Sequence, residues 1–226
     1  MPWLAELGAI LWVLATWPLG LLPRSRKSSG GVPVVLLHGW AMTPASMAVL
    51  AARLRRSGHP VYQIGYGSLG PDMKGKAARI EARMRKIAAA STAGKIDVVA
   101  HSLGGLLARA AVRYYGAGAY VEHLVTLGTP HGGTALAAFL RRPNVRPMRP
   151  GSTFLRRLAE NDPVPAQVAC TAIFSTFDAL VFPVECAEYR GAMNVEVDDV
   201  GHLGLLLSPR VFTLVEESLA ERCRGG

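Results

Sequence analysis

Hydrophobic and polar positions follow two alternating periods along most of the chain. Six short apolar runs, several of them rich in β-branched residues, predict buried strands over 32–37, 61–64, 96–100, 121–127, 168–174 and 193–197. Segments with apolar residues at helical spacing predict helices over 44–56, 73–90, 103–115, 135–141, 152–160 and 209–221. Strands separated by helices indicate βαβ units. The pattern therefore predicts an α/β fold, with a mostly parallel sheet of about six strands and helices on both faces.

Residues 1–23 have a different composition. The stretch 7–22 carries no charge and, with Trp3, holds three of the four tryptophans. A membrane-spanning helix needs about 20 mostly apolar residues, and tryptophan favours the membrane interface. The basic cluster follows the apolar run, which favours an uncleaved anchor with the rest of the chain on the cytoplasmic side. The alternatives are a cleaved signal peptide of a secreted protein and a hydrophobic helix docked on the globular domain.

The remaining sequence predicts a linker over 24–31 and one α/β domain over 32–226. The net charge is +9, and many of the cations fall on the predicted helices 44–56 and 73–90, where solvated helix faces are the usual explanation. No nucleic-acid-binding motif accompanies these charges, so nucleic acid is not expected as a partner. The three cysteines lack metal-ligand spacing. We expect a monomer without metal or cofactor.

Candidate chemistry begins where the strand 96–100 ends, in the sequence Ala100-His101-Ser102-Leu103-Gly104-Gly105. A serine among small residues between a strand and a helix is typical of a nucleophile elbow. The usual motif is G-x-S-x-G, and Ala100 replaces its first glycine with another small residue. A serine in this place can also serve only as a helix N-cap. A nucleophile additionally needs a base and an acid, and these follow it along the chain in this fold.

Of the six histidines, His202 comes late enough to be the base. It follows the last predicted strand and has a glycine on its N-terminal side, Gly201. The acid is expected just beyond the strand 168–174, at the sheet edge where ligand-facing residues collect, which favours Asp178. Asp198 and Asp199 are the competitors, but they lie so close to His202 that we expect them to cap or solvate its loop.

Acyl transfer also requires donors for a tetrahedral oxyanion. The backbone N–H of Leu103 is expected to be one donor and that of Trp40, in the loop after the first strand, the other. His38 is expected to brace that loop through a hydrogen bond. The apolar residues expected to bind an acyl chain, unless they are ordinary core, are Met42, Leu136, Phe139, Leu180, Val181, Phe182 and Leu203.

Four segments together carry a family resemblance. They are Val34-Val35-Leu36-Leu37-His38-Gly39-Trp40, the elbow, Leu127-Gly128-Thr129-Pro130-His131-Gly132-Gly133-Thr134 and Gly201-His202-Leu203-Gly204-Leu205-Leu206. In this order they resemble bacterial lipases of the α/β-hydrolase superfamily. The alanine of the elbow is similar to that of the small Bacillus-type lipases. The resemblance spans about 32–207 and implies the same catalytic positions without a metal, whereas the N-terminal apolar segment departs from it.

The sequence thus predicts a serine carboxylester hydrolase that cleaves lipid or other acyl esters through an acyl-enzyme. Its catalytic residues would be Ser102, Asp178 and His202. One alternative is an acyltransferase, deacylase or thioesterase that uses the same residues. Another is a membrane-bound interaction module without catalysis, which the presence of a full set of three residues disfavours.

Overall fold

A single parallel sheet forms the centre of the molecule. The computed structural model describes Glu6, Gly8 and Leu11 and the ranges 31–140, 142–160 and 165–221. Within them, six parallel strands follow the order β2-β1-β3-β4-β5-β6. The strands are β1 (Val34–Leu37), β2 (Val61–Ile64), β3 (Ile96–His101), β4 (Val121–Leu127), β5 (Ala169–Ser175) and β6 (Met193–Val197). The predicted parallel sheet is confirmed.

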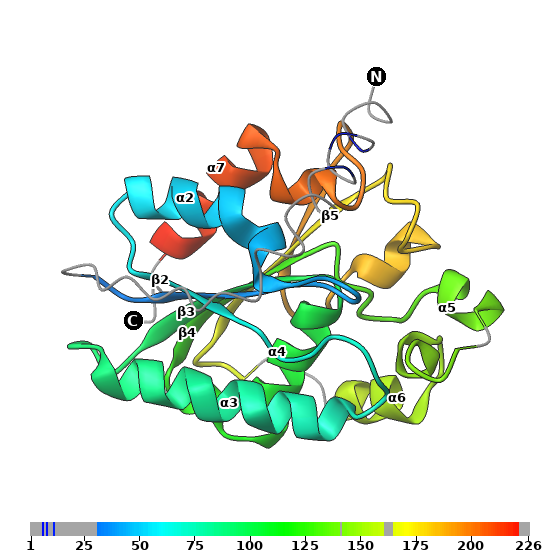
Figure 1. Cartoon of the computed structure of the whole chain (residues 1–226), viewed down its shortest axis with the longest axis horizontal. Helices are drawn as coiled ribbons and strands as arrows, with labels where there is room; N and C mark the ends of the chain where they lie inside the picture. The colour runs from blue at the N-terminus through cyan, green and yellow to red at the C-terminus, as the bar shows by residue number, and fades with distance from the viewer. Residues whose placement is uncertain are drawn as a thin grey trace.

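Helices cover both faces of this sheet (Figure 1). One face carries α2 (Ala48–Arg56) and α7 (Pro209–Ala220), and the other carries α3 (Met73–Ala90) and α4 (Leu103–Tyr114). Two shorter helices are α5 (Ala135–Phe139) and α6 (Thr153–Ala159). The 3₁₀ turns are η2 (Pro44–Met47), η3 (Ala117–Ala119), η4 (Arg146–Met148), η5 (Val184–Ala187) and η6 (Gly204–Leu206).

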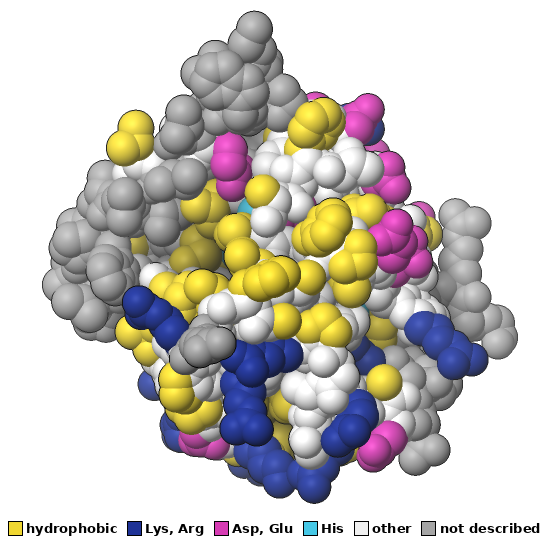
Figure 2. All heavy atoms as spheres, turned by 90° about the vertical axis from the view of Figure 1, so that its right-hand side faces the viewer, with side chains coloured by type: hydrophobic (Ala, Val, Ile, Leu, Met, Phe, Trp, Pro, Cys, Tyr) yellow, Lys and Arg dark blue, Asp and Glu magenta, His cyan; other side chains and the backbone are white. Residues whose placement is uncertain are grey.

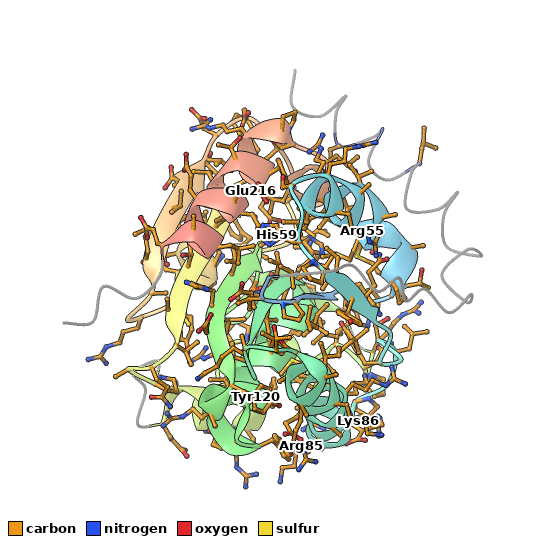
Figure 3. All side chains as sticks on the ribbon, turned by 90° about the vertical axis from the view of Figure 1, so that its left-hand side faces the viewer. Arg55, His59, Arg85, Lys86, Tyr120 and Glu216 are labelled. Carbon is orange, nitrogen blue, oxygen red and sulfur yellow. The ribbon has the colours of Figure 1, made fainter. Side chains whose placement is uncertain are left out.

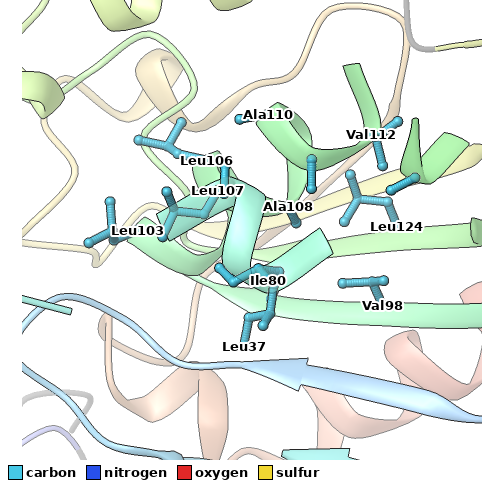
Figure 4. Packing of buried hydrophobic residues seen from close by; sticks show 14 of the residues in the cluster. Leu37, Ile80, Val98, Leu103, Leu106, Leu107, Ala108, Ala110, Val112 and Leu124 are labelled. Atoms are coloured by element: carbon cyan, nitrogen blue, oxygen red, sulfur yellow. The ribbon is translucent and has the colours of Figure 1, made fainter. Parts of the chain in front are cut away.

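The sheet divides the hydrophobic core into two layers because successive side chains of a strand point to opposite faces. In β1, Val35 and Leu37 belong to the cluster under α3 and α4, whereas Val34 and Leu36 belong to the cluster under α2 and α7. Figure 4 shows the first cluster, in which Leu37 lies near Ile80 of α3. Strands buried on both faces explain the nearly continuous apolar runs in the sequence.

Polar contacts join the outer elements. In the loop that follows α2, His59 lies 3.3 Å from Glu216 of α7. The hydroxyl of Tyr120 donates to Glu81 of α3 over 3.1 Å, and Arg85 lies 3.4 Å from the same carboxylate. Figure 3 views the molecule from the side on which these labelled residues lie. The first contact joins α7 to the loop between α2 and β2, the second joins α3 to the residue before β4, and the third lies within α3.

The element boundaries differ little from the prediction. The predicted helix 44–56 begins with the 3₁₀ turn η2 before α2, because Pro44 and its neighbours form a tighter first turn. The predicted N-terminal helix 1–23 and linker 24–31 lie outside the described residues, apart from Glu6, Gly8, Leu11 and Gly31. Among the helices that the structure describes, none is long and apolar enough to cross a membrane.

Candidate active site

The turn between β3 and α4 holds Ser102 in a rare backbone conformation. Its φ is +52° and its ψ is −121°, and side-chain-bearing residues seldom adopt a positive φ. The N–H of Ser102 donates to the carbonyl of Leu127 over 2.9 Å, and its carbonyl accepts from the Thr129 hydroxyl over 3.1 Å. The strand-to-helix turn therefore has the strained geometry of a nucleophile elbow.

The sheet topology places this turn at a ligand-binding edge. Strand β1 has β2 on one side and β3 on the other, so the connections that follow β1 and β3 diverge. Such a switch point opens a crevice at the carboxyl ends of parallel strands. Helix α4 packs tightly here, since a Cβ on Gly104 would lie 2.6 Å from the His38 carbonyl oxygen. Ser102 follows β3, and the loop that contains Trp40 follows β1.

His202 and Asp178 form a buried hydrogen-bonded pair. Nδ1 of His202 lies 2.6 Å from Oδ2 of Asp178, and both side chains are almost fully buried. The other carboxylate oxygen, Oδ1, accepts from the N–H groups of Leu180 and Val181 over 2.8 and 3.0 Å. The loop after β5 thus fixes the carboxylate, and Nε2 of His202 is the ring nitrogen that remains for proton transfer.

The competing acids occupy a different environment. Asp198 and Asp199 lie 2.9 and 3.4 Å from Nη1 of Arg210, and all three side chains are largely exposed. Their carboxylates therefore interact with solvent and with α7. The structure brings Asp178, and neither of these two, to the ring of His202.

His101 supports the histidine loop, a contact that the sequence analysis did not predict. Its Nε2 donates to the carbonyl oxygen of His202 over 3.0 Å, and the two ring centroids are 4.6 Å apart. Burial lowers the pKa of His101 well below its usual value, so the ring is neutral near pH 7. The sequence feature that could have indicated this contact is the position of His101 in the elbow motif, directly before Ser102.

The loop after β1 is braced in a similar way. Nδ1 of His38 donates to the Gly39 carbonyl over 3.0 Å, and its ring stacks on Tyr66 with centroids 4.4 Å apart. The Tyr66 hydroxyl donates to the His38 carbonyl. Burial lowers the pKa of His38 to about 4. The neutral imidazole is thus a structural hydrogen-bond donor next to Trp40.

Gly128, after β4, lies beneath the buried pair. Its φ is +52°, and a Cβ at this position would lie 3.1 Å from both Asp178 Oδ2 and His202 Nδ1. A side chain here would therefore press on the two bonded atoms. Sequence analysis gave Gly128 no role, although it stands in one of the four segments that carry the family resemblance.

A cavity of about 300 Å³ connects the predicted residues. Ser102 and His202 both line it, and Trp40 stands in its wall. Leu103 begins α4, so its N–H is one of those without a partner inside the helix. The predicted apolar residues that line the cavity are Met42, Leu136, Leu180, Val181 and Leu203. Residues in its wall that were not predicted are Ala41, Pro130, Thr134, Ala137, Leu140, Val145 and Met148.

Two of the predicted substrate-binding residues lie outside this cavity. Phe139 is 82% exposed and Phe182 is 65% exposed. Leu136 of the short helix α5 and Leu140, its C-cap, both line the cavity, whereas Phe139, the last residue of α5, does not. Figure 2 views the sheet edge where β1 ends and shows hydrophobic side chains gathered around a hollow.

One group of possible metal ligands occurs among the described residues, and it lies at the opposite sheet edge. It consists of Asp97, Glu122 and His123, near the beginnings of β3 and β4. Nδ1 of His123 lies 2.7 Å from Asp97, and Nε2 is 2.8 Å from the carbonyl oxygen of Glu221. Because a carbonyl only accepts, Nε2 of His123 donates to Glu221, and Nδ1 is the ring nitrogen that faces Asp97.

Two triacylglycerol lipases are similar to part of this chain. A triacylglycerol lipase from Burkholderia plantarii is 30% identical over 155 residues, which cover 59% of this chain and 42% of that protein. A triacylglycerol lipase from Pseudarthrobacter phenanthrenivorans is 32% identical over 119 residues, covering 48% and 36%. The chain thus spans about two fifths of the length of these relatives.

The chain also matches a solved lipase structure and a protein-family model. The mature form of a Bacillus licheniformis lipase has a TM-score of 0.72 and 18% identity, covering 87% of this chain and 96% of that one, which shows the shared fold. The family model described as palmitoyl protein thioesterase matches residues 33–178, a range that includes Ser102 and Asp178 and ends before His202. Because this range exceeds half of the sequence, the chain belongs to the palmitoyl protein thioesterase family of α/β-hydrolases.

Proposed function

We propose that the protein is a serine hydrolase that cleaves acyl esters through an acyl-enzyme. The observation that carries the proposal is the cavity into which the strained elbow residue Ser102 and the Asp178-bound His202 both open. A serine hydroxyl near its ordinary pKa is a weak nucleophile, and a positioned histidine overcomes this. The arrangement supplies a nucleophile, a base and an orienting acid in one place.

The reaction would proceed in two stages. The Oγ of Ser102 attacks the ester carbonyl carbon while its proton moves to Nε2 of His202. The tetrahedral intermediate collapses, the C–O bond to the alcohol breaks, and His202 returns the proton to the leaving oxygen. Water then repeats these steps on the acyl-enzyme and releases the acid. Throughout, the Asp178 carboxylate at 2.6 Å stabilises the imidazolium and holds its orientation.

The oxyanion would be held by backbone N–H groups of Leu103 and Trp40. Leu103 begins α4, whose positive helix end favours developing negative charge. Trp40 follows the braced His38–Gly39 segment and lines the cavity. Each such donor is worth about 3–4 kcal/mol of the activation barrier in a serine hydrolase.

The wall of the cavity favours an apolar acyl group as the substrate. Leu136, Leu180 and Val181 line it, and the first two are partly exposed. A cavity of about 300 Å³ holds a small ligand or part of an acyl chain. The exposed apolar side chains on α5 and on the loop after β5 extend this surface outward (Figure 2). Lipid esters and other esters of apolar acids are therefore the proposed substrate class.

Phosphonylation by a fluorophosphonate probe tests the mechanism directly. We expect the wild-type chain to form one covalent adduct and Ser102→Ala to form none. Ser91→Ala, at the end of α3, serves as a matched control and should be labelled like the wild type. A folded wild-type protein that stays unlabelled would contradict the proposal. Hydrolysis of p-nitrophenyl esters of increasing chain length would then define the acyl preference.

A thioester is the second candidate substrate, because the family model that matches this chain is the palmitoyl protein thioesterase model. The same residues would cleave a C–S bond, with His202 donating its proton to the leaving thiolate sulfur. Paired oxoester and thioester substrates with the same acyl chain separate the two candidates. A higher kcat/KM for the thioester, corrected for its intrinsic reactivity, would favour this alternative. Acyl transfer would show as new ester formed when an alcohol acceptor is added.

Membrane contact through residues 1–22 remains a separate proposal. It rests on the composition of that segment, in which 7–22 carries no charge and three tryptophans occur. We expect the full-length chain to remain with the membrane fraction after an alkaline wash, as a monomer in detergent, with its catalytic domain facing the cytoplasm. Recovery of the full-length chain in the wash without detergent would contradict it. Protease protection in sealed vesicles would test the orientation, including the secreted alternative.

A further inference from the structure

A carboxylate from the beginning of the chain binds the histidine loop. Oε1 of Glu6 lies 2.8 Å from the N–H of Leu203, and Oε2 lies 2.9 Å from the N–H of Gly204. These are the two residues that follow His202. The partners are 197 and 198 positions apart in sequence. Both oxygens of one side chain are thus engaged on the backbone beside the proposed base.

The contact meets a specific need of the loop. Gly204 begins the 3₁₀ turn η6, and Leu203 is its N-cap. The first N–H groups of a helical turn have no partner inside it, and Leu203 has no side-chain oxygen that could cap them. An ionised carboxylate that accepts N–H bonds is a stronger acceptor than a neutral group. Glu6 therefore provides from outside the cap that the loop itself lacks.

The loop also provides the space that this carboxylate occupies. A Cβ on Gly201 would lie 2.5 Å from Glu6 Oε2, and one on Gly204 would lie 3.3 Å from the same oxygen. The φ of Gly201 lies outside the left-handed region, so its backbone alone would accept alanine. The missing side chain at Gly201 is thus explained by the position of Glu6.

The remaining contacts of the loop hold it from the other side. The carbonyl of His202 accepts from His101, and the ring of His202 binds Asp178. Without Glu6, the Leu203 and Gly204 N–H groups would lose their acceptor while these inner contacts remained. The imidazole would then keep its partner but lose part of the constraint on its direction. Loss of such support misplaces a catalytic group more than it weakens the fold.

We propose that Glu6 is a positioning residue of the active site, which holds the loop 201–204 so that His202 faces Ser102. The inference rests on the proposed function, because it concerns the same base. It makes Glu6 necessary for full catalysis. A membrane-spanning helix over 7–22 would place Glu6 and this loop on opposite sides of the membrane, so the contact and the spanning anchor exclude each other, and the alkaline wash decides between them.

Substitution of Glu6 in the full-length chain tests this role. We expect Glu6→Ala to lower kcat roughly 10-fold and the rate of fluorophosphonate labelling by a similar factor, with KM within about twofold of wild type. Glu6→Gln keeps one acceptor oxygen, so its kcat and labelling rate should lie between those of Glu6→Ala and the wild type. Glu217→Ala, an exposed carboxylate of α7, is the matched control and should leave both rates unchanged. Wild-type rates in Glu6→Ala would overturn the proposal.

Gly201→Ala tests the same contact by changing the loop instead of Glu6. The added methyl group should displace the carboxylate and lower kcat as Glu6→Ala does. In the double variant the two losses should not multiply, because the second change removes a contact that is already lost. Gly118→Ala, where a Cβ meets only ordinary contacts of 3.5 Å or more, controls for the backbone effect of alanine. Independent, multiplying losses would overturn the proposal.

A readout without substrate separates this proposal from the proposed function. In ¹⁵N spectra, the amide signals of Leu203 and Gly204 should shift in Glu6→Ala and stay in place in Glu217→Ala. Unshifted signals would overturn the role of Glu6 even in an active enzyme. If the signals shift in Glu6→Ala but the wild-type chain reacts with neither ester nor probe, the proposed function is overturned instead.

Discussion

His101 donates a hydrogen bond from Nε2 to the carbonyl oxygen of His202, 3.0 Å away, so the residue that precedes the nucleophile supports the backbone of the base. Both residues are buried. The elbow and the histidine loop are therefore coupled directly, and a change at one should reach the other without contact with substrate.

Replacement of His101 by leucine should lower both stability and activity. The buried carbonyl of His202 would lose its donor, which costs about 1–3 kcal/mol of unfolding free energy. We expect kcat to fall while KM stays near the wild-type value. Urea unfolding and ester kinetics measure the two effects. His59→Leu, at the partly exposed contact with Glu216, is the control and should retain kcat. Full activity in His101→Leu would contradict the coupling.

Asp178→Asn should nearly abolish catalysis while the fold persists. The amide keeps the size of the carboxylate but no longer stabilises the imidazolium or its tautomer, and in serine proteases this change lowers kcat by roughly 10⁴-fold. Burst and steady-state kinetics with an activated ester would measure it. Asp198→Asn, whose carboxylate pairs with Arg210 at the surface, should keep its activity. Equal losses in the two variants would rule out the assignment of Asp178.

Gly128→Ala should damage the active site by steric pressure. Its Cβ would lie 3.1 Å from Asp178 Oδ2 and His202 Nδ1 at a φ of +52°. Gly151→Ala offers a matched comparison, because Gly151 has a φ of +69° with open space around a Cβ. Both variants should lose about 1–2 kcal/mol from the left-handed backbone, but only Gly128→Ala should lose kcat. Thermal unfolding and ester kinetics distinguish these effects.

The contact of His123 with Asp97 predicts a pH-dependent stability. The hydrogen bond to Asp97 raises the pKa of His123 above its ordinary value of 6.5, against the opposing effect of burial. A raised folded-state pKa stabilises the fold fully below pH 6.5, and the contribution is lost as the pH rises through the higher value. The destabilisation by His123→Gln, measured by urea unfolding, should therefore be larger at pH 5.5 than at pH 9. A constant difference would contradict this account.

Local sequence signals were enough to predict the sheet and most helices. The elbow around Ser102 was predictable because a strand, a serine and small residues follow one another directly. Likewise, Asp178 follows the predicted strand that became β5. The contact of Glu6 with Leu203 was not predictable, since it joins positions 197 apart and depends on how the chain packs. The spacing of apolar and polar residues contains no signal for a contact of this kind.

Side-chain direction on short elements was equally hard to predict. Leu136 and Phe139 both belong to the five-residue helix α5, yet the first lines the cavity and the second is 82% exposed. One helical turn carries too few apolar positions to define its buried face. The sequence therefore predicted apolar residues near the site but not which of them form its wall.

Leu136 lines the cavity and Phe139 does not, so the two side chains should affect acyl-chain selectivity differently. Leu136→Ser and Leu180→Ser remove apolar surface from the cavity wall, so they should lower kcat/KM for long-chain esters more than for short-chain esters. A loss of about 1 kcal/mol of apolar contact corresponds to roughly a fivefold change. Phe139→Ser, outside the cavity, should leave this chain-length ratio unchanged on soluble esters, as should Met193→Ser on β6. Hydrolysis of p-nitrophenyl esters from four to twelve carbons, about the range that spans short and long acyl groups, measures the ratio. An altered ratio in Phe139→Ser, with Leu136→Ser unchanged, would mean that the acyl chain follows the exposed surface of α5 instead of the cavity.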